Sequence, residues 1–475
     1  MVDQKSAPRS QGAWAMALTS AAFFMGALDA LVVITALPTI HRDIGGTLSS
    51  LEWTVNAYTL AVAAGIITAA ALGDRLGRRR VYTFGLLLFT VASAACAMAP
   101  SIEVLIAART LQGVGAAIIT PLSLTILTAA FPAARRGAIV GIWGGIGGLA
   151  IAAGPLVGGA VTQGLSWHWI FWVNVPIGIA AAILSTRFLA ESHGPVTRLD
   201  VPGLALVTSG AIGVIWGLVR ANDAGWASAE VVAALGLGVL ALAAFILWET
   251  RAPAPMLPLR LFKVRTFAAA NATAFLMMGT ITSAAFLASQ YFQLGLGYSP
   301  LGTGLRFLPL TGTPFLVAPL AGLLSDRIGT RPLIVTGLAL GALGLGWIAR
   351  IATAGVGYDQ LVVPFVVVGV GISMAMANTP AAALSAVAPA DIGKASGVVN
   401  TLQRFGSAFA IAIVSAVFAA NGHFGSPVSV AAGFRPAITV AAGLSLLGAI
   451  TALAITSRRR TPMHAAQRVV AEDAA

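Results

Sequence analysis

The feature of this chain that most limits its fold is a succession of long apolar segments. A transmembrane helix needs about 20 largely apolar residues, and fourteen segments of the 475-residue sequence satisfy that length. They cover residues 13–38, 51–72, 81–98, 102–128, 138–162, 168–189, 201–220, 230–248, 266–290, 302–324, 332–350, 359–387, 395–419 and 435–456. Only 9% of the residues are charged, against about 25% in soluble domains. The sequence therefore predicts an all-α integral membrane protein.

The distribution of the 28 Lys and Arg residues predicts how these helices are oriented. Cytoplasmic loops of membrane proteins carry an excess of both residue types. With the N-terminus in the cytoplasm, most of them fall on the inner side, and the outer side holds only Arg42, Arg220, Arg350 and Arg435. This bias predicts an even number of spans in a bacterial plasma (inner) membrane, with both termini cytoplasmic. It also explains the net charge of +12 without nucleic acid as a partner.

An internal repeat divides the chain into two halves. Residues 73–79 (Gly-Asp-Arg-Leu-Gly-Arg-Arg) follow the second segment, and residues 325–331 (Ser-Asp-Arg-Ile-Gly-Thr-Arg) follow the tenth. Parallel six-helix repeats around a central site are a known transporter plan, so we expect two six-helix bundles with two helices inserted between them. The predicted parts are a cytoplasmic tail at 1–12, a first bundle at 13–200, the inserted helices and linker at 201–265, a second bundle at 266–456 and a cytoplasmic tail at 457–475.

Two ionisable residues deep in apolar segments form the candidate coupling site. A charge in the hydrocarbon core costs at least about 2.5 kcal/mol, so such residues are functional candidates. Asp29 lies nine residues below the outer end of the first segment, and Arg109 lies eight below that of the fourth. Burial favours a protonated carboxyl group, whereas a nearby cation favours the ionised form. We therefore expect Asp29 to take up and release a proton beside Arg109, although a structural carboxyl group and an anchoring arginine fit the same pattern.

Further polar residues on the segments are predicted to line a central substrate cavity. Arg306 and Arg404 lie nearer the ends of their segments, where their side chains could instead extend to the membrane interface. The other cavity candidates are the polar side chains Asn56, Tyr58, Gln112, Asn378, Asn400 and Gln403. Trp and Phe residues in such a lining would suit lipophilic or aromatic cargo.

The fifth segment is rich in glycine and is predicted to be a packing or hinge helix. The candidate residues are Gly141, Gly145, Gly154, Pro155, Gly158 and Gly159. Glycines four residues apart let helix backbones approach closely in lipid, and proline can kink a helix because it lacks a backbone donor. The pattern fits static packing as well as a helix that slides or bends during gating.

The two copies of the repeated loop predict a charged latch on the cytoplasmic face. Asp74 lies at the C-terminal end of a helix, where the helix dipole disfavours an anion. It therefore needs a partner, such as Arg75, Arg78 or the N-terminus of another helix. A latch made in one state and broken in another would act as a switch, whereas a topology signal alone would not require the acid. The residues assigned to the latch are Asp74, Arg75, Gly77, Arg78, Asp326, Arg327 and Gly329.

Four motifs occur in order along the chain, at residues 28–38, 72–79, 105–117 and 141–159. They resemble the helix-one, cytoplasmic-loop, helix-four and helix-five motifs of the major facilitator superfamily, in its fourteen-helix drug:proton antiporter branch. The resemblance covers nearly the whole chain. It implies the major facilitator fold, two six-helix bundles plus two inserted helices, and it implies that Arg109 takes part in proton transfer.

The function that the resemblance implies is proton-coupled export. Such an antiporter would move small, lipophilic or cationic molecules out of the cell by alternating access. A proton-coupled importer or facilitator on the same scaffold is the alternative. The sequence has no G-x-x-x-x-G-K-[ST], H-E-x-x-H or G-x-S-x-G motif, so we expect no enzyme activity, no catalytic or metal site and no cofactor other than coupling protons. The expected partners are a small-molecule substrate and the lipid bilayer, and we expect a monomer.

Overall fold

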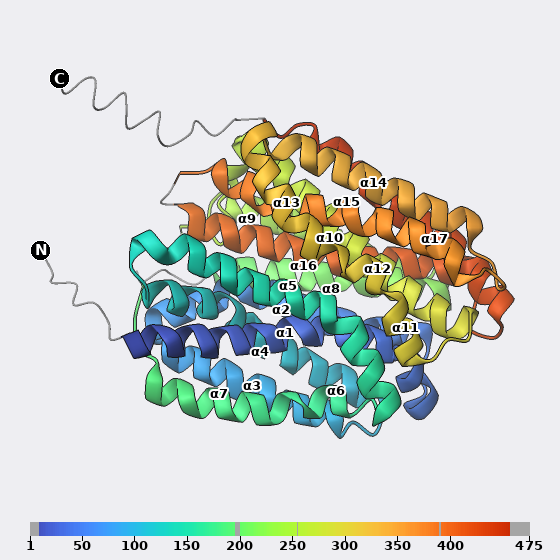
Figure 1. The fold of residues 1–475 in the computed structure, drawn as a ribbon, viewed down its shortest axis with the longest axis horizontal. Coiled ribbons are helices and arrows are strands. Elements are labelled where there is room, and N and C mark those ends of the chain that lie inside the picture. Colours follow the sequence, from blue (N-terminus) through green and yellow to red (C-terminus); the bar gives the residue numbers. More distant parts are fainter. Residues whose placement is uncertain (1–8, 195–199, 254, 389–390, 457–475) are drawn as a thin grey trace, which may run out of the picture.

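The computed structural model describes residues 9–194, 200–253, 255–388 and 391–456 as long helices that run in roughly the same direction (Figure 1). Within these ranges no strand occurs, and fourteen helices are long and apolar enough to cross a membrane. The predicted all-α membrane fold is confirmed. Both ends of the described chain lie on one side of the molecule, here called the inner end. The opposite side, where α1 (Arg9–Ile44) turns into α2 (Leu48–Leu76), is the outer end.

The first half builds six spans around α1 and α4, which pack against each other and against the remaining helices. α1 contacts α5 and α7, whereas α4 contacts α2 and α3. The last span is divided at Val173 into a short α6 and a longer α7. The elements after α2 are α3 (Arg78–Ala97), α4 (Ile102–Ala129), α5 (Ala133–Gly164), α6 (Trp169–Trp172) and α7 (Asn174–Phe188).

The second half repeats this plan around α10, which packs against α15, α16 and α17. Its elements are η1 (Leu259–Lys263), α10 (Arg265–Gln290), η2 (Tyr291–Gly295), α11 (Pro300–Arg306), α12 (Leu308–Thr311), α13 (Thr313–Ile328), α14 (Thr330–Ile351), α15 (Tyr358–Ser385), α16 (Ile392–Asn421) and α17 (Pro427–Ala452). η1 is a short 3₁₀ turn, and η2 continues α10 as a π-helix.

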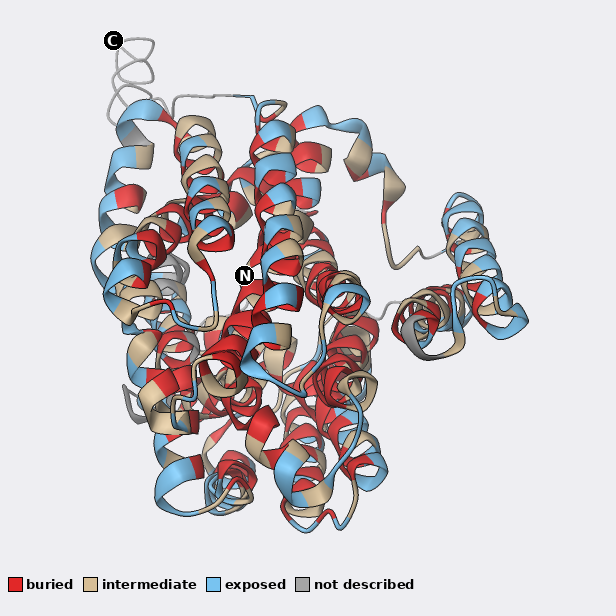
Figure 2. Cartoon of the chain, turned by 90° about the vertical axis from the view of Figure 1, so that its right-hand side faces the viewer, coloured by how far each residue is buried: buried red, intermediate tan, exposed pale blue. Residues whose placement is uncertain are grey.

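The two inserted helices form a hairpin at the edge of the molecule. α8 (Val201–Ala224) packs against α2 and α16, one helix from each half, and α9 (Ala229–Glu249) packs against α8. In Figure 2, which looks onto the outer end, the hairpin lies at the right-hand edge. It therefore covers the flank along which α2 and α16 meet.

The structure confirms the span predicted over residues 302–324, with its apolar part at Leu308–Ser325, but the helix is interrupted. This span consists of three consecutive helices, α11, α12 and α13, with breaks at Phe307 and Gly312. Pro309 and Pro314 lie in the first turns of α12 and α13. Proline lacks a backbone donor and clashes with the preceding turn, so it is tolerated where a helix begins, and glycine weakens a helix interior. These residues divide the span.

α1 continues six residues past Pro38, where the sequence predicted its end. Proline at this position cannot donate a hydrogen bond to the carbonyl oxygen of Ile34, four residues earlier. The hydroxyl group of Ser289, on α10 of the second half, donates to that oxygen at 3.0 Å. A partner from the other half thus satisfies the carbonyl group that proline leaves free, as helix breaks inside membranes require.

The two halves join at the outer end. One buried apolar cluster there includes side chains of both halves, among them Val33 and Phe286. The other large clusters lie mainly within one half each, around Leu122 in the first and Leu338 in the second. α2 and α16 stay in contact toward the inner end, where Gly397 lies beside Ile67. On the opposite flank α5 packs against α11 and α12, whereas no comparable packing of described residues joins α5 to α13, so the halves are joined at the outer end and parted along α5 and α13 toward the inner end.

Candidate functional site

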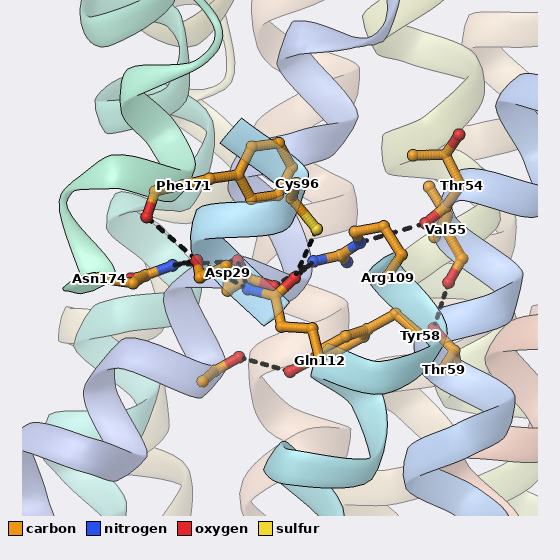
Figure 3. A network of polar contacts seen from close by, with 12 residues as sticks. Asp29, Thr54, Val55, Tyr58, Thr59, Cys96, Arg109, Gln112, Phe171 and Asn174 are labelled. Atoms are coloured by element: carbon orange, nitrogen blue, oxygen red, sulfur yellow. Dashed lines mark hydrogen bonds and ion pairs between the residues drawn. The ribbon is translucent and has the colours of Figure 1, made fainter. Parts of the chain in front are cut away.

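The candidate coupling site is a buried ion pair inside the first half. Asp29 of α1 and Arg109 of α4 pair directly through their side chains (Figure 3), as their similar depth in the sequence led us to expect. Asp29 is 1% exposed, and Arg109 is fully buried. Removing one partner of a buried pair costs about 3–5 kcal/mol, because the other charge is left uncompensated. The pair therefore holds α1 against α4.

Two amide side chains complete the surroundings of the carboxylate. Gln112 Nε2 donates to Asp29 Oδ1 at 2.9 Å, and Asn174 Nδ2 donates to the same oxygen at 3.3 Å. Both amides also donate to the hydroxyl oxygen of Ser93, at 3.2 and 3.0 Å. Hydrogen bonds to an ionised acceptor are stronger than neutral ones. The network thus ties α1, α3, α4 and α7 together at one depth.

Arg109 has further partners that do not depend on Asp29. Its Nε donates to the carbonyl oxygen of Thr54 at 3.2 Å, and its Nη1 donates to Gln112 Oε1 at 2.7 Å. Its guanidinium carbon lies 4.2 Å from the centre of the Tyr58 ring, within the range of a cation–π interaction. If Asp29 gains a proton, these groups still hold the guanidinium. The site can therefore accommodate both protonation states of Asp29.

Tyr58 packs over the arginine of the ion pair. Its ring packs on Arg109, and its hydroxyl group donates to the carbonyl oxygen of Gly26 at 3.1 Å. Gly26 itself is partly exposed, and no described atom lies where a Cβ of this residue would contact it. Asp29, which is 1% exposed, is therefore enclosed by its neighbours in this state.

The other residues predicted for the cavity are placed differently. Asn56 is fully buried in α2, and its amide has no hydrogen-bond partner among the described residues. Asn378 is buried in α15 and donates to the carbonyl oxygen of Met374 in its own helix. Arg306 lies at the outer end, with its guanidinium 3.6 Å from the centre of the Tyr298 ring. The structure therefore brings Tyr58 and Gln112 into the Asp29 site and leaves these three residues outside it.

The α16 candidates lie along the middle of α16. Asn400, Gln403 and Arg404 are all partly exposed. Asn400 and Arg404 are four residues apart and so share one helix face. That face continues to Gly397, beside Ile67 of α2. Within the described part of the chain Arg404 forms no ion pair, so this face of α16 carries a positive charge without an acidic partner.

Near the outer end the glycines of α5 pack closely on the backbone of neighbouring helices. A Cβ on Gly154 would lie 2.9 Å from that of Leu31 in α1, and one on Gly158 would lie 2.6 Å from the Val32 carbonyl oxygen. A Cβ on Gly159 would collide with the backbone at residues 300 and 301, at the start of α11. These contacts require glycine. The carbonyl group of Pro155 likewise packs directly on Gly304.

The inner half of α5 differs from its outer half. Gly145 is exposed, and no described atom lies near the position of its missing Cβ. Gly141 belongs to the same helix, but its surroundings lie outside the described part of the chain. The exception in this half is Gly147, where a Cβ would collide with the Phe23 ring of α1, so α5 packs on a side chain there and on backbone at residues 154–159.

The repeated loops have the same backbone conformation in both halves. Gly77 joins α2 to α3 with φ 108°, and Gly329 joins α13 to α14 with φ 85°. A positive φ favours glycine over residues that carry a Cβ. Arg75 and Arg327 are exposed. Asp326 occupies the repeat position at the end of α13, but its side chain lies outside the described residues.

Asp74 finds its partner within its own loop. Arg78 Nε donates to Asp74 Oδ1 at 2.8 Å. Two backbone hydrogen bonds connect this loop to the segment after α7. The Gly194 amide donates to the Asp74 carbonyl oxygen at 3.0 Å, and the Arg78 amide donates to the Ser192 carbonyl oxygen at 2.8 Å. In this state the charged residues of the loop bind elements of the first half.

Glu191 belongs to this loop cluster and was missed by the sequence analysis. Its carboxylate accepts the backbone N–H groups of Arg79 at 2.9 Å and Arg80 at 3.3 Å, at the N-terminus of α3. Negative charge is stabilising at a helix N-terminus, where backbone donors lack partners. The acid stands far from the loop in sequence, so spacing alone could not connect them.

Replacing Glu191 with alanine should lower the thermal stability of the protein. Glu191→Ala leaves the N–H groups of Arg79 and Arg80 without their acceptor, which we expect to cost about 1–2 kcal/mol. Thermal unfolding in detergent measures the effect. Glu230→Ala is the matched control, because it removes a half-exposed ion pair with Arg220 that is worth under about 1 kcal/mol. Equal midpoints for the two variants would show that Glu191 does not anchor the loop.

Asn174 and Ser93 were also missed, although the sequence contained a signal for both. Each is a polar residue inside an apolar segment, a few residues from its predicted outer end. A comparison of depth like the one that paired Asp29 with Arg109 would have selected them. Among the described residues, no group of three or more His, Cys, Asp or Glu side chains could hold a metal ion.

Comparison with known proteins gives a consistent result. The family model described as Major Facilitator Superfamily matches residues 18–411 and 270–472. The chain is 33% identical over 401 residues to the tetracenomycin C resistance and export protein of Streptomyces glaucescens, covering 84% of this chain and 74% of that protein. It is 34% identical over 470 residues to the cephamycin export protein CmcT of Amycolatopsis lactamdurans, covering 96% of each.

A solved structure matches over nearly the whole fold. The crystal structure of an auto-inhibited POT family peptide transporter superposes with a TM-score of 0.70 and 14% identity, over 96% of this chain and 99% of that chain. At this identity the likeness concerns the fold alone.

Proposed function

The chain belongs to the major facilitator superfamily, and we propose that it exports small molecules, lipophilic or cationic ones among them, in exchange for protons that bind at Asp29. The relatives described above are named for resistance and export, and they match most of this chain. The proposed location is a bacterial plasma (inner) membrane with both termini in the cytoplasm. The inner end of the structure is then its cytoplasmic end. A monomer suffices, because one chain holds both halves of the transporter.

The observation that carries the proposal is the Asp29–Arg109 pair together with the second set of partners around Arg109. Protonation of Asp29 removes the attraction that holds the two side chains together. Arg109 then retains Thr54, Gln112 and Tyr58 as partners. Proton binding thus releases α1 from Arg109, which continues to hold α2 and α4 together.

α1 transmits this change to the contact between the halves. Just beyond Asp29 toward the outer end, the carbonyl oxygens of Ile34 and Thr35 accept hydrogen bonds from Ser289 and Gln293, at 3.0 and 2.9 Å. A ligand shifts a conformational equilibrium only if it makes different contacts in the two states. A proton that loosens α1 from α4 provides that difference, because α1 contributes to the closed outer end.

The proton gradient supplies the energy for this cycle. Each tenfold difference in proton concentration is worth about 1.4 kcal/mol, and 100 mV of membrane potential adds about 2.3 kcal/mol per charge. Protons as coupling ions therefore suffice without a further cofactor. The substrate enters from the parted inner end, between α5 and α13, and leaves when the outer end opens.

Drug accumulation in a pump-deficient bacterial host tests the proposal. Cells that express the protein should hold several-fold less tetracenomycin C or cephamycin than cells with an empty vector. An uncoupler that dissipates the proton gradient should abolish the difference, because the gradient is the only energy source in the proposed cycle.

Two outcomes would contradict this function. Export that survives the uncoupler would separate transport from protons. Higher accumulation in expressing cells would identify an importer on the same scaffold. A panel of other lipophilic antibiotics guards against testing only compounds that the cavity does not bind.

A further inference from the structure

The outer end of the second half contains a pocket that the transport cycle does not use. It has a volume of about 690 Å³ and lies between α14, the end of α16 and α17. Its lining consists of Gly346, Ala349, Arg350, Asn421, Ala432, Arg435, Pro436 and Thr439. Two arginines therefore share one pocket, and no acidic residue lines it.

These arginines are exceptions to the charge bias of the chain. Of the four arginines expected on the outer side, Arg220 pairs with Glu230. Arg350 and Arg435 form no ion pair among the described residues, and both are exposed. Arg435 Nε donates to the carbonyl oxygen of Ala349 at 3.2 Å. That bond places its guanidinium beside the end of α14, next to Arg350.

The pocket lies at the level where lipid tails give way to headgroups. Along one face of α14, Leu343 is exposed, Trp347 is 47% exposed one turn further out, and Arg350 follows. Tryptophan is enriched at the membrane–water interface. On α17, Arg435 and Thr439 continue outward from the exposed apolar residue Leu446. Both faces change from apolar to cationic at the same end of the helices.

We infer that this pocket binds the phosphate group of an anionic phospholipid from the outer leaflet. Arg350 and Arg435 supply paired positive charge, and Asn421 and Thr439 supply polar groups for the rest of the headgroup. Guanidinium groups bind phosphate oxygens with well-matched geometry. The exposed apolar face of α14 below the arginines, which includes Leu343, accepts the acyl chain. The bound lipid bridges α14 and α17 and neutralises two charges that would otherwise remain without a counterion.

Lipid binding to the purified full-length protein tests the inference. Native mass spectrometry should show that the protein retains phosphatidylglycerol in preference to phosphatidylethanolamine. Phosphatidylglycerol should also raise the thermal unfolding midpoint more than phosphatidylethanolamine does. One basic residue near an anionic lipid contributes roughly fivefold in affinity. Arg350→Gln should therefore weaken phosphatidylglycerol binding about fivefold, and Arg350→Gln with Arg435→Gln about 25-fold.

The controls separate this site from general surface charge. Arg350→Gln leaves the hydrogen bond from Arg435 to the Ala349 carbonyl oxygen intact. It therefore tests the effect of the Arg350 charge alone. Arg350→Lys should keep the lipid preference. Arg42→Gln removes another exposed outer arginine and should change nothing. Equal binding of the two lipids, or an Arg350→Gln protein that binds like the wild type, would overturn the inference. So would an equal midpoint shift with glycerol phosphate alone, which would indicate a site for a free anion.

Discussion

Asp29→Asn should reduce proton-driven export to the background level and leave the protein folded. Asparagine has nearly the shape of aspartate and still offers an oxygen to Gln112 and Asn174, but its side chain cannot take up a proton near neutral pH. Efflux driven by a pH gradient in reconstituted vesicles measures the effect. Full drug resistance in cells that express this variant would remove Asp29 from the mechanism.

Variants of Arg109 distinguish a loss of coupling from a loss of structure. Arg109→Gln leaves Asp29 buried without its counterion, which costs about 3–5 kcal/mol of stability. The double variant Asp29→Asn/Arg109→Gln removes both charges and should recover most of that loss. The stability losses of the two substitutions depart from additivity in this way only if the two residues interact. The double variant should remain unable to couple transport to protons.

Gly159→Val should nearly abolish transport by a different route. A Cβ on Gly159 collides with the backbone at residues 300 and 301, which no side-chain rearrangement relieves. The outer end could then not close along α5 and α11, and the protein would be held in an outward-opened state. Alkylation of a cysteine placed at position 301 reports this directly. We expect faster labelling from the outside in the valine variant.

Gly148→Val is the matched control for this experiment. Gly148 lies in the same helix, but no described atom lies within 4 Å of its missing Cβ. The substitution adds the same side chain without a collision, so transport should stay within a few-fold of the wild type. Equal loss in both variants would show that α5 is sensitive to valine itself rather than to closure of the outer end.

The helical spans could be predicted because each follows from a local property of the chain. Fourteen apolar segments of sufficient length specify fourteen spans, and the structure confirms them. Breaks within spans were harder to predict. Pro309 and Pro314 divide one span, whereas Pro38 and Pro155 lie inside continuous helices. The presence of a proline alone does not decide whether a helix breaks, because neighbouring helices can satisfy the backbone groups that the proline frees.

The depth of a residue within its predicted span revealed only part of the coupling site. Depth paired Asp29 with Arg109, because each is the unusual charge in its segment. The depth of Asn174 makes it a candidate, but depth does not show that it reaches Asp29, which depends on α7 packing beside α1. Nor could it reveal that Tyr58 covers the pair, since that depends on how α2 is rotated about its axis. Side-chain direction is set by packing among helices, which the sequence of one helix does not contain.

The missing amide hydrogen of Pro38 has a consequence for how readily the outer end opens. When α1 and α10 separate, the Ile34 carbonyl oxygen loses the Ser289 hydroxyl group and has no donor in its own helix to replace it. An unsatisfied group of this kind costs about 1–3 kcal/mol away from water, so separation is affordable only once a water molecule arrives. If the proposed cycle opens the outer end, we therefore expect water to reach Ile34 as α1 and α10 begin to separate.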